Sequence, residues 1–97
     1  MDQRIYSLHV DLRVTLATDW IVGGDADRFR MESRRYLKTP AQMMYNTPEQ
    51  IFDELERIGL LGPGNYNVLR ELTRNLHVEI QDIISEFERK MGINQQN

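Results

Sequence analysis

Residues 51–87 read IFDELERIGLLGPGNYNVLRELTRNLHVEIQDIISEF, and this stretch decides the fold. Its apolar side chains recur every three or four positions in three runs, which is the pattern of helices that bury one face. The runs are Ile51, Leu55 and Ile58, then Val68, Leu69, Leu72 and Leu76, then Ile80, Ile83, Ile84 and Phe87. The stretch predicts three helices, and the rest of the chain must supply the other walls of their core.

Composition indicates one globular domain that contacts another protein. The chain has 97 residues, 40% of them hydrophobic, which suits a single modest core. Twelve basic and 15 acidic residues give a net charge of −3. Nucleic-acid binding usually needs a basic face, whereas nearly balanced charge suits salt-bridged protein contact. The chain has no cysteine, which excludes disulfides, thiolate metal sites and cysteine nucleophiles.

The N-terminal region has no targeting or spanning pattern. Charges at positions 2, 4, 11 and 13 interrupt any signal-peptide apolar region. No run of about 18 apolar residues is present either. We therefore expect a cytoplasmic protein with no membrane partner, and the absence of cysteine fits a reducing compartment.

Residues 5–17 fit two secondary structures. Leu8, Val10, Leu12, Val14 and Leu16 alternate with polar residues, as in a strand. Ile5, Leu8, Leu12 and Leu16 also share one helix face. No second clear strand follows, and a lone strand leaves its backbone groups unpaired, so a helix is expected. A strand pair formed by dimerisation or domain swapping is the alternative.

The next helix is expected from Asp25, as its N-cap, to Lys38. One of its faces is basic and carries Arg28, Arg30, Arg34, Arg35 and Lys38. Such a face either serves only to keep the helix solvated or docks acidic side chains of a partner.

Two capping boxes follow. Thr39 with Gln42, and Thr47 with Gln50, each place a proline directly after the threonine. The first box predicts a short helix through Tyr45, whose Met43–Met44 pair is expected to fill gaps in the core. The second predicts a helix over 51–58 that Gly59 closes.

Asn65 is expected to cap a helix that continues to Leu76, and Gly92 to end a last helix near Met91. The count is six helices, one of them short, in an all-α antiparallel bundle. Residues 1–93 form one domain, and residues 94–97 are expected to be a flexible tail.

Catalytic constellations are missing from the sequence. His9 and His77 form no zinc-binding pattern, and no serine lies in a nucleophile elbow. The segment 62–64 lacks the lysine of a phosphate loop and is interpreted as a turn. We therefore expect neither an enzyme nor a bound cofactor or metal.

A helix-turn-helix nucleic-acid reader is the alternative function. The joint at 59–65 would be its turn, and the following helix would offer Asn67, Arg70, Arg74 and Asn75 to the groove. The acidic net charge disfavours this interpretation, so nucleic acid is not expected as a partner.

The segment Phe52–Leu61, FDELERIGLL, resembles the fourth helix of a death effector domain and its exit. Asn65 followed by Leu69–Leu72, LREL, is similar to the fifth helix of that family. The resemblance implies a death fold, a six-helix Greek-key bundle without enzymatic activity. It also implies homotypic binding to other death-fold proteins, of adaptor or initiator caspase type, in apoptotic or inflammatory signalling. Self-assembly is a further possibility that it raises.

One departure separates this chain from the family pattern. The sixth helix of the family commonly carries an Arg-x-Asp-Leu motif whose charges join a surface triad. Here the corresponding residues are Ile80, Gln81, Asp82 and Ile83, so the arginine is replaced and the full triad cannot form. Asp82 could instead accept a bond from Arg34 or Arg35. Caspase recruitment and pyrin domains remain alternative subfamilies.

The sequence thus predicts a partner-binding site made of two faces on two copies. Arg30, Arg34 and Arg35 on the basic helix would meet Asp53 and Glu56 of a neighbour, with Asp82 as a further acidic contact. Association through different faces can run head to tail and form filaments if it does not close.

Overall fold

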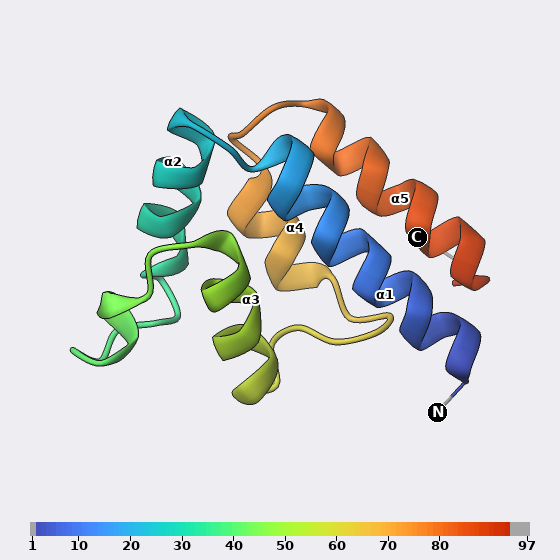
Figure 1. The fold of residues 1–97 in the computed structure, drawn as a ribbon, viewed down its shortest axis with the longest axis horizontal. Coiled ribbons are helices and arrows are strands. Elements are labelled where there is room, and N and C mark those ends of the chain that lie inside the picture. Colours follow the sequence, from blue (N-terminus) through green and yellow to red (C-terminus); the bar gives the residue numbers. More distant parts are fainter. Residues whose placement is uncertain (1, 94–97) are drawn as a thin grey trace.

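A computed structural model describes residues 2–93 as an all-helical chain (Figure 1). The α-helices are α1 (Gln3–Thr15), α2 (Gly24–Ser33), α3 (Pro48–Arg57), α4 (Asn67–Thr73) and α5 (Glu79–Met91). A π-helical turn, η1 (Leu16–Trp20), continues α1, and a 3-10 turn, η2 (Gln42–Met44), precedes α3. No strand occurs within residues 2–93, which confirms the all-α prediction. The predicted tail at 94–97 lies outside the described residues.

The ambiguous segment 5–17 is helical, so the strand alternative is wrong. The carboxylate of Asp2 caps α1 by accepting the backbone N–H of Arg4 at 2.8 Å. Leu12 and Leu16 are fully buried on the helical face. In η1 the backbone N–H of Ile21 donates to the carbonyl oxygen of Leu16 at 2.7 Å, five residues back.

The prediction of six helices is wrong, because the short helix expected through Tyr45 is only a 3-10 turn and residues 2–93 contain five α-helices. Thr39 and Gln42 do form their reciprocal capping bonds, at 3.1 and 3.2 Å. The chain nevertheless leaves the helical region at Tyr45, where ψ is 127°. A residue before proline favours extended backbone, and Thr47 precedes Pro48 with a ψ of 153°. The second helix start therefore limits the first to a single 3-10 turn.

The second capping box forms as predicted. The hydroxyl of Thr47 accepts the backbone N–H of Gln50 at 3.2 Å, and the Gln50 side chain accepts the N–H of Thr47 at 3.2 Å. Pro48 occupies the first helical position of α3. Gly59 follows the helix with a φ of +83°, a conformation that favours glycine.

Two predicted N-caps have other roles or none. α2 starts one residue before Asp25, whose carboxylate instead accepts the backbone N–H of His77 at 3.2 Å. α4 begins after Tyr66, so Asn65 is not its cap. α2 also ends at Ser33 rather than Lys38, because the chain turns there to bury Leu37. At the other end of the chain, Gly92 caps α5 with a φ of +83°, as predicted.

The helices enclose one hydrophobic core. α1 and α5 run antiparallel side by side, α4 lies beneath them, and α2 and α3 form the other end of the molecule (Figure 1). The first and last turns meet where Arg4 donates to the Lys90 carbonyl oxygen at 2.7 Å. At the other end, Phe29 and Phe52 pack edge to face with their ring centroids 5.6 Å apart. This leaves α2 and α5 with outward faces on different sides of the molecule.

Candidate functional site

The basic face of α2 and of the turn after it separates into paired and unpaired cations. Arg30 lies 3.7 Å from Asp27, and Arg35 forms ion pairs with Glu32 at 2.8 Å and with Glu71 at 2.9 Å. Within residues 2–93, Arg34 has no ion pair and is exposed. Arg28 and Lys38 are also exposed and have no ion pair within residues 2–93. They lie on the predicted basic face but outside the predicted partner-binding site. Of the three predicted arginines, Arg34 is therefore the one whose charge remains available to a partner.

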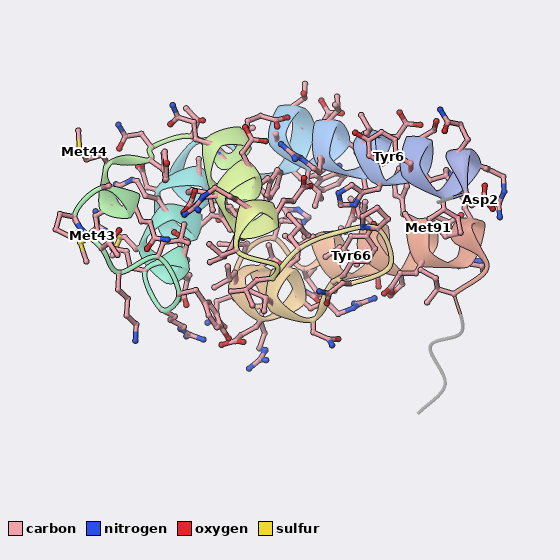
Figure 2. All side chains as sticks on the ribbon, turned by 90° about the horizontal axis from the view of Figure 1, so that it is seen from below. Asp2, Tyr6, Met43, Met44, Tyr66 and Met91 are labelled. Atoms are coloured by element: carbon pink, nitrogen blue, oxygen red, sulfur yellow. The ribbon has the colours of Figure 1, made fainter. Side chains whose placement is uncertain are left out.

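Exposed methionines lie at the same end of the molecule. Met31 on α2 is 61% exposed, and Met43 and Met44 in η2 are 43% and 74% exposed. Figure 2 shows Met43 and Met44 projecting from the turn at the end of the molecule away from Asp2. The expectation that this pair fills the core is wrong, because η2 contributes no buried residue. Thioethers adapt to irregular surfaces, so exposed methionines suit protein contact.

The outer face of α2 is hollowed. A shallow depression of about 400 Å³ is lined by Gly24, Asp27, Arg28, Met31 and Glu32. Its two acids are compensated, Asp27 by Arg30 and Glu32 by Arg35. The depression therefore combines one apolar side chain, that of Met31, with the unpaired cation of Arg28.

The predicted acidic partners, Asp53 and Glu56, are held within the molecule by Arg13. The guanidinium of Arg13 lies 2.7 Å from Asp53, 2.7 Å from Glu49 and 2.8 Å from Glu56. Partial burial lowers the pKa of Arg13, but hydrogen bonds to these three carboxylates raise it further, so the net shift is upward. The structure brings Asp53 and Glu56 together, but as intramolecular partners of α1.

A buried polar chain joins this cluster to the core. His9 is 2% exposed, and its Nε2 lies 2.7 Å from Oε2 of Glu56. Its Nδ1 lies 2.8 Å from the hydroxyl of Tyr66, which also contacts Sδ of Met91 at 3.7 Å. Burial is the main cause that raises the pKa of Tyr66 to about 12. Nothing reactive points to solvent here, so the arrangement ties α1 and α5 to the segments around α3 and α4.

Glu54 on α3 is a buried acid that the sequence does not predict to lie in the core. It accepts hydrogen bonds from Arg57 at 2.5 and 2.9 Å and from Gln42 at 2.8 Å. The bonds from Arg57 are the main cause that lowers its pKa to about 2. A carboxylate held in its charged form in this way stabilises the joint between η2 and α3 and cannot serve as a proton donor at neutral pH.

The outer face of α5 carries the remaining acidic patch. Asp82 and Glu79 are exposed and have no ion pair within residues 2–93. Glu86, one turn further along, is paired with Arg89. Neither predicted bond to Asp82 forms: Arg35 is directed to Glu32 and Glu71, and Arg34 has no ion pair within residues 2–93. Ile80, which replaces the arginine of the family motif, is fully buried.

Arg70 connects α4 to α5, whereas the helix-turn-helix alternative would have it contact a nucleic-acid groove. It projects from α4 onto α5, where it donates to Ser85 at 2.9 Å and forms an ion pair with Glu88. It also reaches the Gln81 side chain at 3.3 Å. These contacts lie 11 to 18 residues away in sequence, a separation that no local motif reveals.

The helix-turn-helix geometry is not present. The joint between α3 and α4 spans residues 58–66, longer than the roughly three or four residues of that turn. α4 is short, and its Arg70 is engaged with α5. No group of three or more histidine, cysteine or acidic side chains in the described chain could hold a metal ion. None of the described helices is long and apolar enough to span a membrane.

Comparisons with family models, curated proteins and solved structures give no match for this chain. The resemblance of residues 52–72 to a death effector domain therefore stands on those motifs alone. The surface itself offers two features to a partner: unpaired cations with exposed methionines on and after α2, and unpaired acids on α5.

Proposed function

We propose that this domain is a non-enzymatic protein–protein interaction module that associates homotypically through the basic face of α2 and the acidic face of α5. The observation that carries the proposal is the distribution of unpaired charge. Arg28 and Arg34 lie on and just after α2, and Glu79 and Asp82 lie on α5, all without ion pairs in residues 2–93. Charged groups of opposite sign that lack partners within one copy are suited to pair between copies.

The positions of the two helices support head-to-tail contact. α2 forms one margin of the molecule and α5 another, and their outward faces point in different directions (Figure 1). One copy can therefore offer its α2 face while its α5 face remains available to a third copy. Contacts of this kind generate rings when the rotation closes and filaments when it does not.

Asp82 replaces Asp53 and Glu56 as the main acidic contact in this proposal. Arg13 already compensates Asp53 and Glu56, so a partner cation would have to compete with three bonds within the chain. Pairing with Asp82 requires no such exchange.

The narrower part of the proposal concerns the class of partner. The motifs at 52–61 and 69–72 support a divergent death-fold domain whose partners are other death-fold proteins in apoptotic or inflammatory signalling. The nucleic-acid alternative is not favoured. The joint between α3 and α4 is longer than a helix-turn-helix turn, and Arg70 of the helix that would enter the groove is engaged with α5.

Charge reversal tests the proposal. Arg34→Glu and Asp82→Arg should each abolish concentration-dependent growth in light scattering at low salt, because each places like charges opposite one another. Mixing the two variants should restore association, because one reversed face of each then meets its complement. Both residues are exposed, so the unfolding midpoint should stay within error.

Asp11→Arg is the matched control, since Asp11 is exposed on α1 and has no ion pair within residues 2–93. It should assemble like the unchanged protein. A protein that stays monomeric at low salt and high concentration, and that captures no death-fold partner, would show the proposal to be wrong.

A further inference from the structure

We propose that Val78 of one copy seats in the depression on α2 of a second copy, and that this apolar contact lies at the centre of the charged interface. The inference rests on the proposed homotypic function and names the contact that gives it specificity. The residues involved are the exposed valine before α5 and the five that line the depression.

Val78 is an apolar side chain held out into solvent. It is 75% exposed, more than any other large hydrophobic residue described. The joint that presents it is fixed: the N–H of His77 donates to Asp25 at 3.2 Å, and the His77 ring meets Trp20 with centroids 5.1 Å apart. A rigid presentation lowers the ordering cost of binding.

The depression on α2 has the shape and the chemistry to receive this side chain. Its volume of about 400 Å³ exceeds that of a valine, and Met31 supplies a flexible apolar wall. Gly24 leaves one side open, because a Cβ atom there would meet nothing within 4 Å. Of the two acids that line it, Asp27 lies 3.7 Å from Arg30 and Glu32 lies 2.8 Å from Arg35, so each has a cation beside it when the valine covers the depression.

Charge complementarity identifies the occupant as a second copy. Glu79 directly follows Val78 and Asp82 comes one helical turn later, both unpaired within residues 2–93. Arg28 lines the depression and Arg34 lies just beyond α2, also unpaired in that range. A valine followed by unpaired acids thus matches a hollow that offers the Met31 side chain and has unpaired cations in and beside it. Because Val78 is 75% exposed, it does not fill the depression of its own copy.

The apolar stripe of Tyr6, Val10 and Val14 on α1 is less exposed than Val78, at 38 to 49%. Val10 is 38% exposed, against 75% for Val78, so it projects less far from the surface and is the weaker candidate to enter a hollow. The stripe instead provides a control surface for the experiment.

Cysteine cross-linking provides the test, because the chain has no native cysteine to interfere. Val78→Cys and Met31→Cys are prepared separately, mixed at low salt and oxidised gently. A disulfide needs Cα atoms within about 7 Å, so a mixed dimer should form only if the valine of one copy enters the hollow of the other. Val10→Cys mixed with Met31→Cys is the control and should give no mixed dimer above background.

A second pair of variants measures the energetic weight of the contact. Gly24→Leu should fill the hollow without backbone strain, and Val78→Asp should place charge on the apolar knob. Each should weaken association by roughly tenfold or more, because the burial of a valine is lost. Circular dichroism should show unchanged helix content in both variants.

The outcomes separate this inference from the function on which it rests. If association remains sensitive to Arg34→Glu, while Val78→Asp and Gly24→Leu have no effect and no mixed disulfide forms, the valine contact is wrong and the charged interface stands. A mixed disulfide together with loss of association in both variants supports the contact. A protein that is monomeric under all conditions overturns both.

Discussion

His9 is a residue whose two ring nitrogens both have defined partners. The Glu56 carboxylate also accepts from Arg13, so it can only accept from Nε2–H of His9. At the other nitrogen, the Tyr66 hydroxyl can donate to Nδ1 or turn toward Met91 and accept instead. Both ring nitrogens therefore have a hydrogen-bond partner, as a polar side chain needs at a site that is 2% exposed.

Replacement of His9 should destabilise the fold. His9→Ala removes one partner from both Tyr66 and Glu56 and leaves the Tyr66 hydroxyl buried without it. A lost partner of this kind costs about 1–3 kcal/mol in the free energy of unfolding. His9→Gln, which can still donate to Glu56, should lose less. Urea denaturation compares the two, and equal stability of His9→Ala and the unchanged protein would contradict the assignment.

The Tyr66 hydroxyl should titrate late. Its folded pKa of about 12, set mainly by burial, exceeds the ordinary value of 10.0, so the folded state holds this proton more tightly than the unfolded chain. The resulting stability is complete below pH 10 and is lost as the pH rises toward 12. Absorbance of the four tyrosines near 295 nm should show late titration that is reduced in Tyr66→Phe. The part that remains belongs to Tyr36, whose pKa is raised mainly by its hydrogen bond to Glu71. A single transition of all four tyrosines at pH 10 would disprove it.

At this scale the sequence predicted charges and caps but not their long-range partners. Thr47 and Gln50 lie three residues apart, so their mutual bonds could be expected from spacing. His9 and Tyr66 are separated by 57 residues, and Arg13 and Asp53 by 40. Such pairs are set by how helices pack, so Asp53 and Glu56 were predicted as a free acidic surface although Arg13 holds them.

At the scale of the element, two copies of one capping device have different consequences. The box at Thr47 opens α3, which buries Ile51, Phe52, Glu54 and Leu55. The box at Thr39 opens η2, which buries nothing. Propagation and tertiary burial, rather than the cap itself, decide whether a helix continues.

Thr47→Ala should therefore destabilise the domain more than Thr39→Ala. Loss of an N-cap hydroxyl costs typically about 1 kcal/mol in the free energy of unfolding, and α3 transmits that loss to the core. Thr39→Ala frees only an exposed turn and should cost well under half as much. Thermal or urea unfolding of the two variants gives the comparison, and the reverse order would contradict it.

Helix existence was predictable because apolar spacing reports burial directly, as in α3 and α5. Helix ends were harder to place. Asp25 was expected to cap α2, yet its carboxylate bonds to His77, 52 residues away. The sequence predicts that this helix continues to Lys38, whereas α2 ends at Ser33 and the chain turns there to bury Leu37.

At the scale of the whole molecule, one core connects all five α-helices. Phe52 is fully buried, packs against Phe29 of α2 and lies 5.4 Å beneath the guanidinium of Arg13 from α1. Elements linked through one core are expected to unfold together, as in most small domains.

Phe52→Ala should lower the free energy of unfolding by about 3–5 kcal/mol, the range for removal of a buried phenylalanine. Circular dichroism and the fluorescence of Trp20, the sole tryptophan, should give coincident transitions in both the variant and the unchanged protein. Val14→Ala, at an exposed site on α1, is the control and should change stability little. Separate transitions by the two probes would show that the ends of the molecule unfold independently.

The surface charges show where whole-molecule prediction from sequence stops. The sequence predicts Arg34 and Asp82 as partner contacts, and both are exposed. It does not predict a role for Val78, Met31 or the depression on α2. They are proposed contacts because they are exposed, and the exposure of an apolar side chain follows from packing rather than from its position in a sequence pattern.

The π-helical turn at 16–20 has a consequence for changes in chain length. Ile21 bonds to Leu16 across five residues, whereas an α-helical bond spans four. Deletion of the exposed Thr18 would convert that bond into an ordinary α-helical one and leave Ile21 facing the core. A deletion at Val10, by contrast, would rotate one end of α1 by about 100° relative to the other. The π-helical turn η1, which continues α1, thus contains one residue more than an α-helical continuation would need.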